Sequence, residues 1–135
     1  MEGLWWLADS DEFDYGSKSK FCWTSMIRQP EFVTEAVFAE ACRTVAKKKP
    51  QLDLGKARLA TLTEGLCVHC MHQGSFDTEP ETLAKMKAFM AENGLRCDLS
   101  ATRRHHEIYL SDPRKGDIAK MKTILRYPVR ELEAK

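Results

Sequence analysis

The sequence of 135 residues is 43% hydrophobic and 30% charged, a composition typical of one globular domain with a buried core. Its 21 Lys and Arg residues nearly balance its 20 Asp and Glu residues. The resulting net charge of +1 gives no electrostatic reason to expect a nucleic-acid partner.

The sequence favours a cytoplasmic protein. Its N-terminal stretch has neither the basic segment nor the long apolar segment of a secretory signal. No apolar run approaches the roughly 20 residues that a membrane helix needs, so we expect no membrane partner. The five cysteines are scattered and odd in number, which favours reduced thiols over a disulfide framework.

The first part of the chain predicts two strands followed by a helix. Residues 2–8 are apolar and aromatic and predict a strand, and the polar residues 9–19 predict a loop or hairpin connection. Residues 21–28 alternate in polarity and predict a second strand, which Pro30 ends. Thr34 is expected to cap the helix. The apolar face of that helix consists of Val37, Phe38, Ala41, Cys42 and Val45.

The middle of the chain predicts a strand and a second helix. Residues 57–62 and 66–72 predict one strand or two short ones, with Gly65 as a break. Thr78 and Glu81 have the spacing of a capping box, which predicts that a helix follows. That helix should end at Asn93-Gly94 and bury Leu83, Met86, Phe89 and Met90.

The last third predicts two further strands. Residues 95–103 are expected to form a connection and Asp117 to cap a short helix. Residues 124–129 predict the final strand, and Pro128, which lacks an N–H group, restricts it to a sheet edge or places it at the strand end.

The strand centred on residues 105–110 carries a carboxylate in its middle. Its side chains alternate: His106, Ile108 and Leu110 point to one face and are expected to pack on a helix, whereas the opposite face carries three polar or aromatic side chains, His105, Glu107 and Tyr109. Strands disfavour Glu unless something on that face uses it. The face is therefore either ordinary solvated sheet with Glu107 paired to an Arg, or the base of a pocket that Glu107 anchors.

Residues 26–30 and 124–128 share a pattern of two apolar residues, Arg, a polar or aromatic residue and Pro. Chance is one explanation, and the other is two related modules. The second module would comprise strand 66–72, the helix after Thr78 and the two last strands, and the first only strands 2–7 and 21–28. Strands 66–72 and 2–7 would then lie at sheet edges that invite pairing with another chain.

The closely spaced residues Cys67, His69, Cys70 and His72 suggest a zinc site, but strand alternation sends them to opposite faces. The Cys67–Cys70 spacing also imitates a redox motif, which requires a helix N-terminus rather than a strand. We expect no metal and no cofactor.

Several stretches resemble the GyrI-like small-molecule-binding domains, specifically their stand-alone group. These stretches are 2–6, 26–30, 64–68, 72–74, 105–113, 122–126 and 128–129. The resemblance implies an α+β fold with an antiparallel sheet, helices on one face and pseudo-duplicated β-α-β-β modules around a concave cleft. That cleft would bind bulky hydrophobic, aromatic, often cationic compounds, as in multidrug binding and detoxification.

The resemblance also sets expectations for activity and assembly. Some stand-alone members resemble hydrolases that open cyclopropane rings. The chain is expected to form a single domain, residues 1–135, whose first module lacks its leading strand and helix. Either a homodimer would complete the cleft, or the chain is a fragment. The alternatives to a hydrolase are a non-catalytic ligand sink or sensor and a protein–protein inhibitor.

The resemblance makes Glu107 the acid of the pocket. It would neutralise a bound cation beside aromatic rings, or act as a general base that activates water. Tyr109 lies on the same face and would assist in binding and catalysis, although it is equally compatible with an amphipathic sheet position.

Four other side chains are candidates to line the ligand site. Strand parity puts one residue of the adjacent pair Trp5 and Trp6 on each face, and we expect Trp6, on the side of Glu2, to line the cleft. Trp23, His72 and His105 are the other ligand-binding candidates. A tryptophan in the position of Trp23 is more often a core residue, and the alternative for His72 is a hydrogen-bonded sheet histidine.

Overall fold

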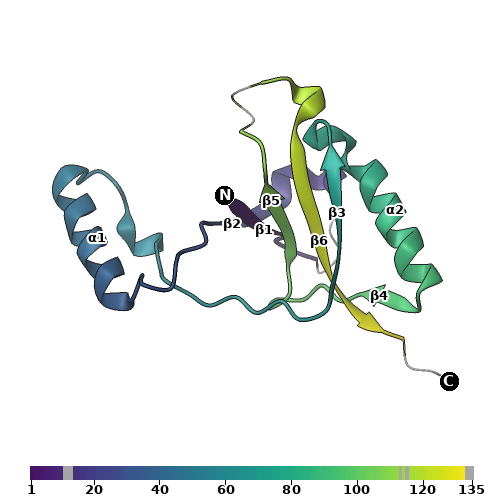
Figure 1. The fold of residues 1–135 in the computed structure, drawn as a ribbon, viewed down its shortest axis with the longest axis horizontal. Coiled ribbons are helices and arrows are strands. Elements are labelled where there is room, and N and C mark those ends of the chain that lie inside the picture. The colour runs from purple at the N-terminus through teal and green to yellow at the C-terminus, as the bar shows by residue number, and fades with distance from the viewer. Residues whose placement is uncertain (11–13, 113, 115, 133–135) are drawn as a thin grey trace. The chain divides into compact units, whose positions relative to one another are not determined.

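The structure is a computed structural model that describes residues 1–10, 14–112, 114 and 116–132 (Figure 1). The chain divides into two compact units, one formed by residues 1–27 and 64–135 and the other by residues 28–63. The expected loop before residue 21 partly falls outside the described residues. Its described part contains a 3₁₀ segment, Tyr15–Lys20.

The larger unit is built on an antiparallel sheet. The order of its main strands is β2-β1-β5-β6-β3, and a short β4 pairs with the end of β6. The strands are β1 (Glu2–Leu7), β2 (Phe21–Met26), β3 (Cys67–Gln73), β4 (Leu95–Cys97), β5 (His105–Tyr109) and β6 (Lys122–Glu131). This confirms the expected α+β fold with an antiparallel sheet, whereas the duplication of its modules stays a prediction.

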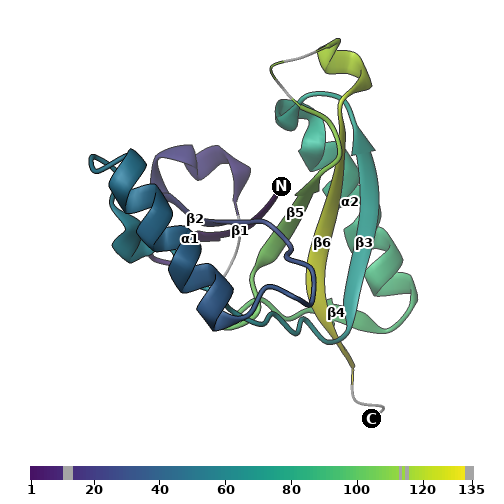
Figure 2. The same ribbon diagram turned by 60° about the vertical axis from the view of Figure 1, so that its left-hand side comes forward.

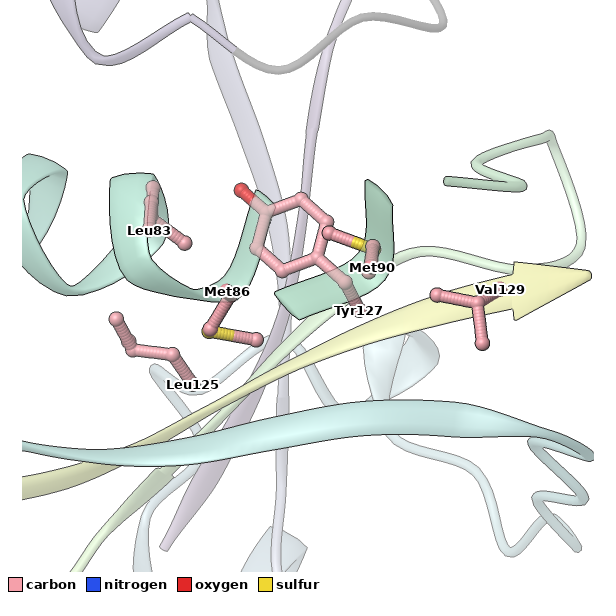
Figure 3. Packing of buried hydrophobic residues seen from close by; sticks show 6 residues of the cluster. All are labelled: Leu83, Met86, Met90, Leu125, Tyr127 and Val129. Atoms are coloured by element: carbon pink, nitrogen blue, oxygen red, sulfur yellow. The ribbon is translucent and has the colours of Figure 1, made fainter. Parts of the chain in front are cut away.

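Helix α2 (Glu79–Glu92) runs along β3 and β6 on one side of this sheet (Figures 1 and 2). Its apolar residues pack against β6 to form the core shown in Figure 3. The six buried members are Leu83, Met86, Met90, Leu125, Tyr127 and Val129. Phe89 was expected in this core but is 51% exposed, because the stripe of positions 83, 86 and 90 turns position 89 away from the sheet.

The start of α2 differs from the predicted capping box. Thr78 ends a 3₁₀ turn, Phe76–Thr78, and its backbone is not extended, so its side chain makes no cap hydrogen bond. Its hydroxyl instead donates to the carbonyl oxygen of Ser75 over 2.9 Å. The helix ends as expected, with Gly94 in the left-handed region at φ 65°.

The pairing register fixes which face of β5 meets the helix. Glu107 pairs with Leu125, and Leu125 packs under α2, so Glu107 lies on the helix-covered face. The expectation that the His106 face would pack on a helix is therefore wrong. The helix packs on the face that carries the apolar residues of β6, because Leu125, Tyr127 and Val129 offer it more apolar surface than β5 alone could.

Two expectations about sheet edges were also wrong. β3 lies at an edge as predicted, but β1 lies between β2 and β5, so β2 forms the other edge. β6 is interior despite Pro128. Its pairing with β5 ends at Arg126 and its pairing with β4 begins at Val129, so the missing N–H group of Pro128 falls between two ladders.

The smaller unit contains helix α1 (Glu35–Lys48) and a 3₁₀ turn at Leu54–Lys56. The hydroxyl of Thr34 accepts a hydrogen bond from the Val37 amide at 3.4 Å, which confirms the predicted cap. Residues 57–66 form no strand, so the strand expected at 57–62 is wrong; most of these side chains are exposed and lack a surface to pack on. Neither α1 nor α2 is long and apolar enough to cross a membrane.

Candidate functional site

Glu107 lies in the middle of β5 with 6% of its surface exposed. The Tyr109 hydroxyl donates to its Oε2 over 2.7 Å, and His105 Nε2 lies 3.0 Å from its Oε1. The Tyr15 hydroxyl lies 3.5 Å from the same Oε1. Trp5 Nε1 in turn donates to the Tyr109 hydroxyl over 2.8 Å. Both oxygens of the Glu107 carboxyl group therefore already have hydrogen-bond partners.

The His105 ring lies between Glu107 and the backbone of β6. His105 Nδ1 lies 3.2 Å from the carbonyl oxygen of Arg126, which can only accept, so Nδ1 carries a hydrogen. The contact between Nε2 and Oε1 is then favourable only if a proton lies on one of those two atoms. His105 thus links the Glu107 carboxyl group on β5 to the backbone of β6.

Aromatic rings surround these polar groups. Trp5 lies 5.7 Å from Trp23 and 5.9 Å from Phe21 between ring centroids, and Phe76 lies 6.0 Å from Tyr109. Of the outer rings, Trp23 is 60% and Phe76 39% exposed. We call the whole group the Glu107 cluster; its members are Trp5, Tyr15, Phe21, Trp23, Phe76, Glu79, His105, Glu107, Tyr109 and Tyr127.

Gly3 pairs with Glu107 across the sheet and leaves space for this group. A Cβ at Gly3 would lie 2.7 Å from Trp5 Nε1 and 3.0 Å from the Tyr109 hydroxyl. Any other residue would therefore push apart the hydrogen bond that holds the phenol, so the glycine is needed for close approach and not for its backbone freedom.

Burial raises the pKa of the Tyr109 and Tyr15 phenols well above their usual value, and the negative charge of Glu107 raises it further. Both hydroxyls therefore keep their protons throughout the physiological pH range. Tyr109 is consequently a permanent hydrogen-bond donor to Glu107.

Glu79, the first residue of α2, brings a second carboxyl group to the cluster and is only 1% exposed. Burial raises its pKa to about 8, the charge of Glu107 adds to that rise, and a hydrogen bond from Tyr15 acts in the opposite direction. Among the described residues, none forms a hydrogen bond with its Oε1. Glu79 is therefore mostly a neutral carboxylic acid at pH 7.

This shift predicts a pH-dependent effect of Glu79→Gln on stability. In the unfolded chain Glu79 ionises near pH 4.5, but in the folded chain it holds its proton until about pH 8, so its contribution to stability falls as the pH rises between those values. The variant has no proton to lose. The free energy of unfolding of the variant, relative to that of the wild type, should therefore increase by about 1 kcal/mol for each pH unit between those two values.

Urea unfolding at several pH values between 5 and 8 measures this gain. Glu81→Gln, an exposed change in the same helical turn, is the control and should follow the wild type at every pH. A difference between Glu79→Gln and wild type that does not change with pH would show that the buried carboxyl is ionised throughout.

The structure brings together some of the predicted site residues and separates others. Glu107, Tyr109 and His105 lie in the cluster, with Trp23 reaching it through Trp5. Trp6 lies on the opposite face, where the Arg104 guanidinium sits 4.8 Å from its ring centroid. Trp6 does share its face with Glu2 as expected, but the β1–β5 register places Trp5, not Trp6, on the side of Glu107.

His72 is buried at 4% exposure and has a different set of partners. Its Nδ1 lies 2.8 Å from the Thr82 hydroxyl and its Nε2 lies 2.9 Å from the Ser75 carbonyl oxygen. These contacts tie the first turn of α2 to β3, which matches the interpretation of His72 as a hydrogen-bonded sheet histidine.

The opposite face of the sheet carries a buried charge network around His106, which is 2% exposed. Its Nε2 lies 2.9 Å from a Glu2 oxygen and its Nδ1 lies 2.8 Å from a Glu64 oxygen, and Glu64 also pairs with Arg126. This network joins β1, β5, β6 and the segment before β3. It engages His106, one of the side chains that sequence parity assigned to helix packing.

No metal centre is apparent in residues 1–10, 14–112, 114 and 116–132, where no three His, Cys, Asp or Glu side chains lie close enough to hold an ion. Cys67 and Cys70 are both free thiols on β3. Sequence reasoning missed Tyr15 and Glu79. Tyr15 lies in a polar stretch that predicts only a loop, and Glu79 has the pattern of any acidic residue in a first helical turn.

Several solved structures are similar to this chain, whereas no curated protein matches the sequence. The chain is 50% identical to an uncharacterized conserved protein from Listeria innocua, with a TM-score of 0.88, and 46% identical to a hydrolase from the same organism, with a TM-score of 0.82. A second Listeria innocua hydrolase is 48% identical with a TM-score of 0.81.

In each comparison the alignment covers 96% of this chain but only 61–62% of the other. The chain thus spans less than two thirds of the proteins that it resembles. The model of the family described as "GyrI-like small molecule binding domain" matches residues 1–130, which is nearly the whole sequence. The chain therefore belongs to the GyrI-like small molecule binding domain family.

Proposed function

We propose that the Glu107 cluster binds bulky hydrophobic aromatic molecules and hydrolyses cyclopropane-type electrophiles among them. The observation that carries this proposal is a buried carboxyl group held by a phenol and an imidazole among aromatic rings. Aromatic side chains provide apolar area and ring faces for a flat ligand, and the carboxyl group provides a proton acceptor. Two of the similar structures bear the name hydrolase, which supports the catalytic part.

The proposed reaction adds one water molecule to a cyclopropane ring conjugated to a carbonyl group. The water oxygen forms a bond to a ring carbon and the neighbouring C–C bond breaks. The electron pair of that bond forms the C=C bond of an enolate as the carbonyl π pair moves onto the carbonyl oxygen. Glu107, in its carboxylate form, takes the proton lost by water, and that proton returns through solvent to the carbonyl oxygen. Tyr109 fixes Glu107 Oε2 and so orients the carboxylate. The chemistry requires no cofactor.

Mass spectrometry of the small molecule tests this proposal. The purified chain is incubated with an aromatic cyclopropyl ketone, and the expected product is heavier than the starting compound by one water. The same incubation with heat-denatured protein is the control. An unchanged compound in both incubations would contradict the hydrolase proposal.

A second candidate is binding without turnover, as in a ligand sink or sensor. The hydrogen bonds of Glu107 favour it, because His105 and Tyr109 already occupy both carboxyl oxygens. In this case the protein would bind the compound, as measured by quenching of tryptophan fluorescence, and release it unaltered.

A further inference from the structure

The two carboxyl groups of the Glu107 cluster differ in their readiness to bind a ligand. Glu107 accepts from Tyr109 at 2.7 Å and contacts His105 at 3.0 Å, so a ligand would have to replace one of those partners. Glu79 has an oxygen, Oε1, without a hydrogen-bond partner among the described residues, although it is buried. Buried polar atoms are normally paired, so an unpaired one marks a position suited to a ligand group.

The charge of the site makes this difference important for cations. The carboxyl oxygens of Glu107 are already held by His105 at 3.0 Å and by Tyr109 at 2.7 Å. Glu79 is mostly protonated at neutral pH. It therefore offers a cation no negative charge until its proton leaves. A positive charge brought into a site of low dielectric would favour that loss strongly.

We propose that Glu79 is the counter-charge for cationic ligands: an aromatic ammonium-type cation binds with release of the Glu79 proton, whereas a neutral aromatic molecule of the same shape binds without it. In this step the O–H bond of the Glu79 acid breaks, the proton goes to the buffer, and the carboxylate remains beside the cation. The inference rests on the proposed function, because it assumes that aromatic molecules bind at the Glu107 cluster.

Several titratable or charged groups surround Glu79 and bear on its proton. They come from the 3₁₀ segment before β2, from the 3₁₀ turn before α2, and from β5 and β6: Tyr15, Lys18, Asp77, Glu107, Tyr109 and Tyr127. The phenols keep their protons, and Lys18 and Asp77 pair with each other at 2.6 Å. Glu107 is the remaining acid that competes with Glu79 as the counter-charge for the cation.

Calorimetry with two compounds of matched shape tests the inference. N-methylquinolinium is a permanent aromatic cation, and 1-methylnaphthalene is its neutral counterpart. At pH 7 the cation should release about one proton per molecule bound, seen as a binding enthalpy that differs between phosphate and Tris buffers. As the pH rises toward 8, the dissociation constant of the cation should fall by about tenfold per pH unit, whereas that of the neutral compound should stay constant.

Variants identify the residue that releases the proton when the cation binds. Glu79→Gln should remove both the proton release and the pH dependence for the cation. Glu81→Gln, on the exposed side of the same turn, should behave as wild type in all respects. The wild-type proton count serves as a readout even if a variant folds poorly.

The remaining outcomes overturn the inference in distinguishable ways. Cation binding without proton release, or release that persists in Glu79→Gln and disappears in Glu107→Gln, would overturn the role of Glu79 and leave the proposed function standing. Failure of both compounds to bind would overturn the proposed function together with this inference.

Discussion

Glu107→Gln is expected to reduce the rate of the proposed cyclopropane hydrolysis by about 100- to 10,000-fold, the usual contribution of a general base. Glutamine keeps the shape of the side chain and an oxygen that can accept from Tyr109. It cannot take a proton from water. Binding of a neutral aromatic compound should therefore change little while turnover is lost, which separates catalysis from binding.

The rate of product formation under saturating substrate measures this effect. Glu64→Gln is the control, because Glu64 lies in the network around His106 on the opposite face of the sheet. Thermal unfolding of both variants shows whether each is folded at the assay temperature. Hydrolysis by Glu107→Gln at the wild-type rate would contradict a base role for this residue.

Leu125→Ala is expected to lower the free energy of unfolding by about 2–5 kcal/mol, the range for large-to-small changes in a packed core. Leu125 is 0% exposed and lies on β6 under α2, between strands β5 and β3 (Figure 3). Its removal leaves a cavity where the helix meets the sheet.

Urea unfolding followed by circular dichroism measures this loss. The matched control is Leu110→Ala, just beyond β5, where the side chain is 54% exposed and the same change should cost within about 0.5 kcal/mol. If the two substitutions had equal effects, the core would not be centred on the contact between α2 and β6.

Local patterns predicted the elements well because each depends on nearby residues. The alternation in Phe21–Met26, the apolar spacing in α2 and the stop at Gly94 are all local signals, and the structure confirms them. Sheet order depends on pairings between distant segments. The interior position of β1 and the tolerance of Pro128 in β6 followed from those pairings, which no single stretch of sequence encodes.

The relative positions of the candidate site residues could be predicted where strand parity was sufficient. Parity alone placed His105, Glu107 and Tyr109 on one face of β5. It could not choose between Trp5 and Trp6, because that choice requires the register between β1 and β5. Tyr15 and Glu79 reach the cluster from a loop segment and a helix start, so only tertiary structure brings their side chains to Glu107.

The NMR signals of the indole N–H groups of the three tryptophans test most directly whether the Glu107 cluster is the ligand site. Trp5 and Trp23 belong to the cluster, and Trp6 on the opposite face is an internal control. Each signal of ¹⁵N-labelled protein is assigned by a Trp→Phe variant, and 1-methylnaphthalene is titrated. We predict that the Trp5 and Trp23 signals shift together while that of Trp6 stays fixed. A shift of the Trp6 signal alone would place the ligand on the other face and contradict the account.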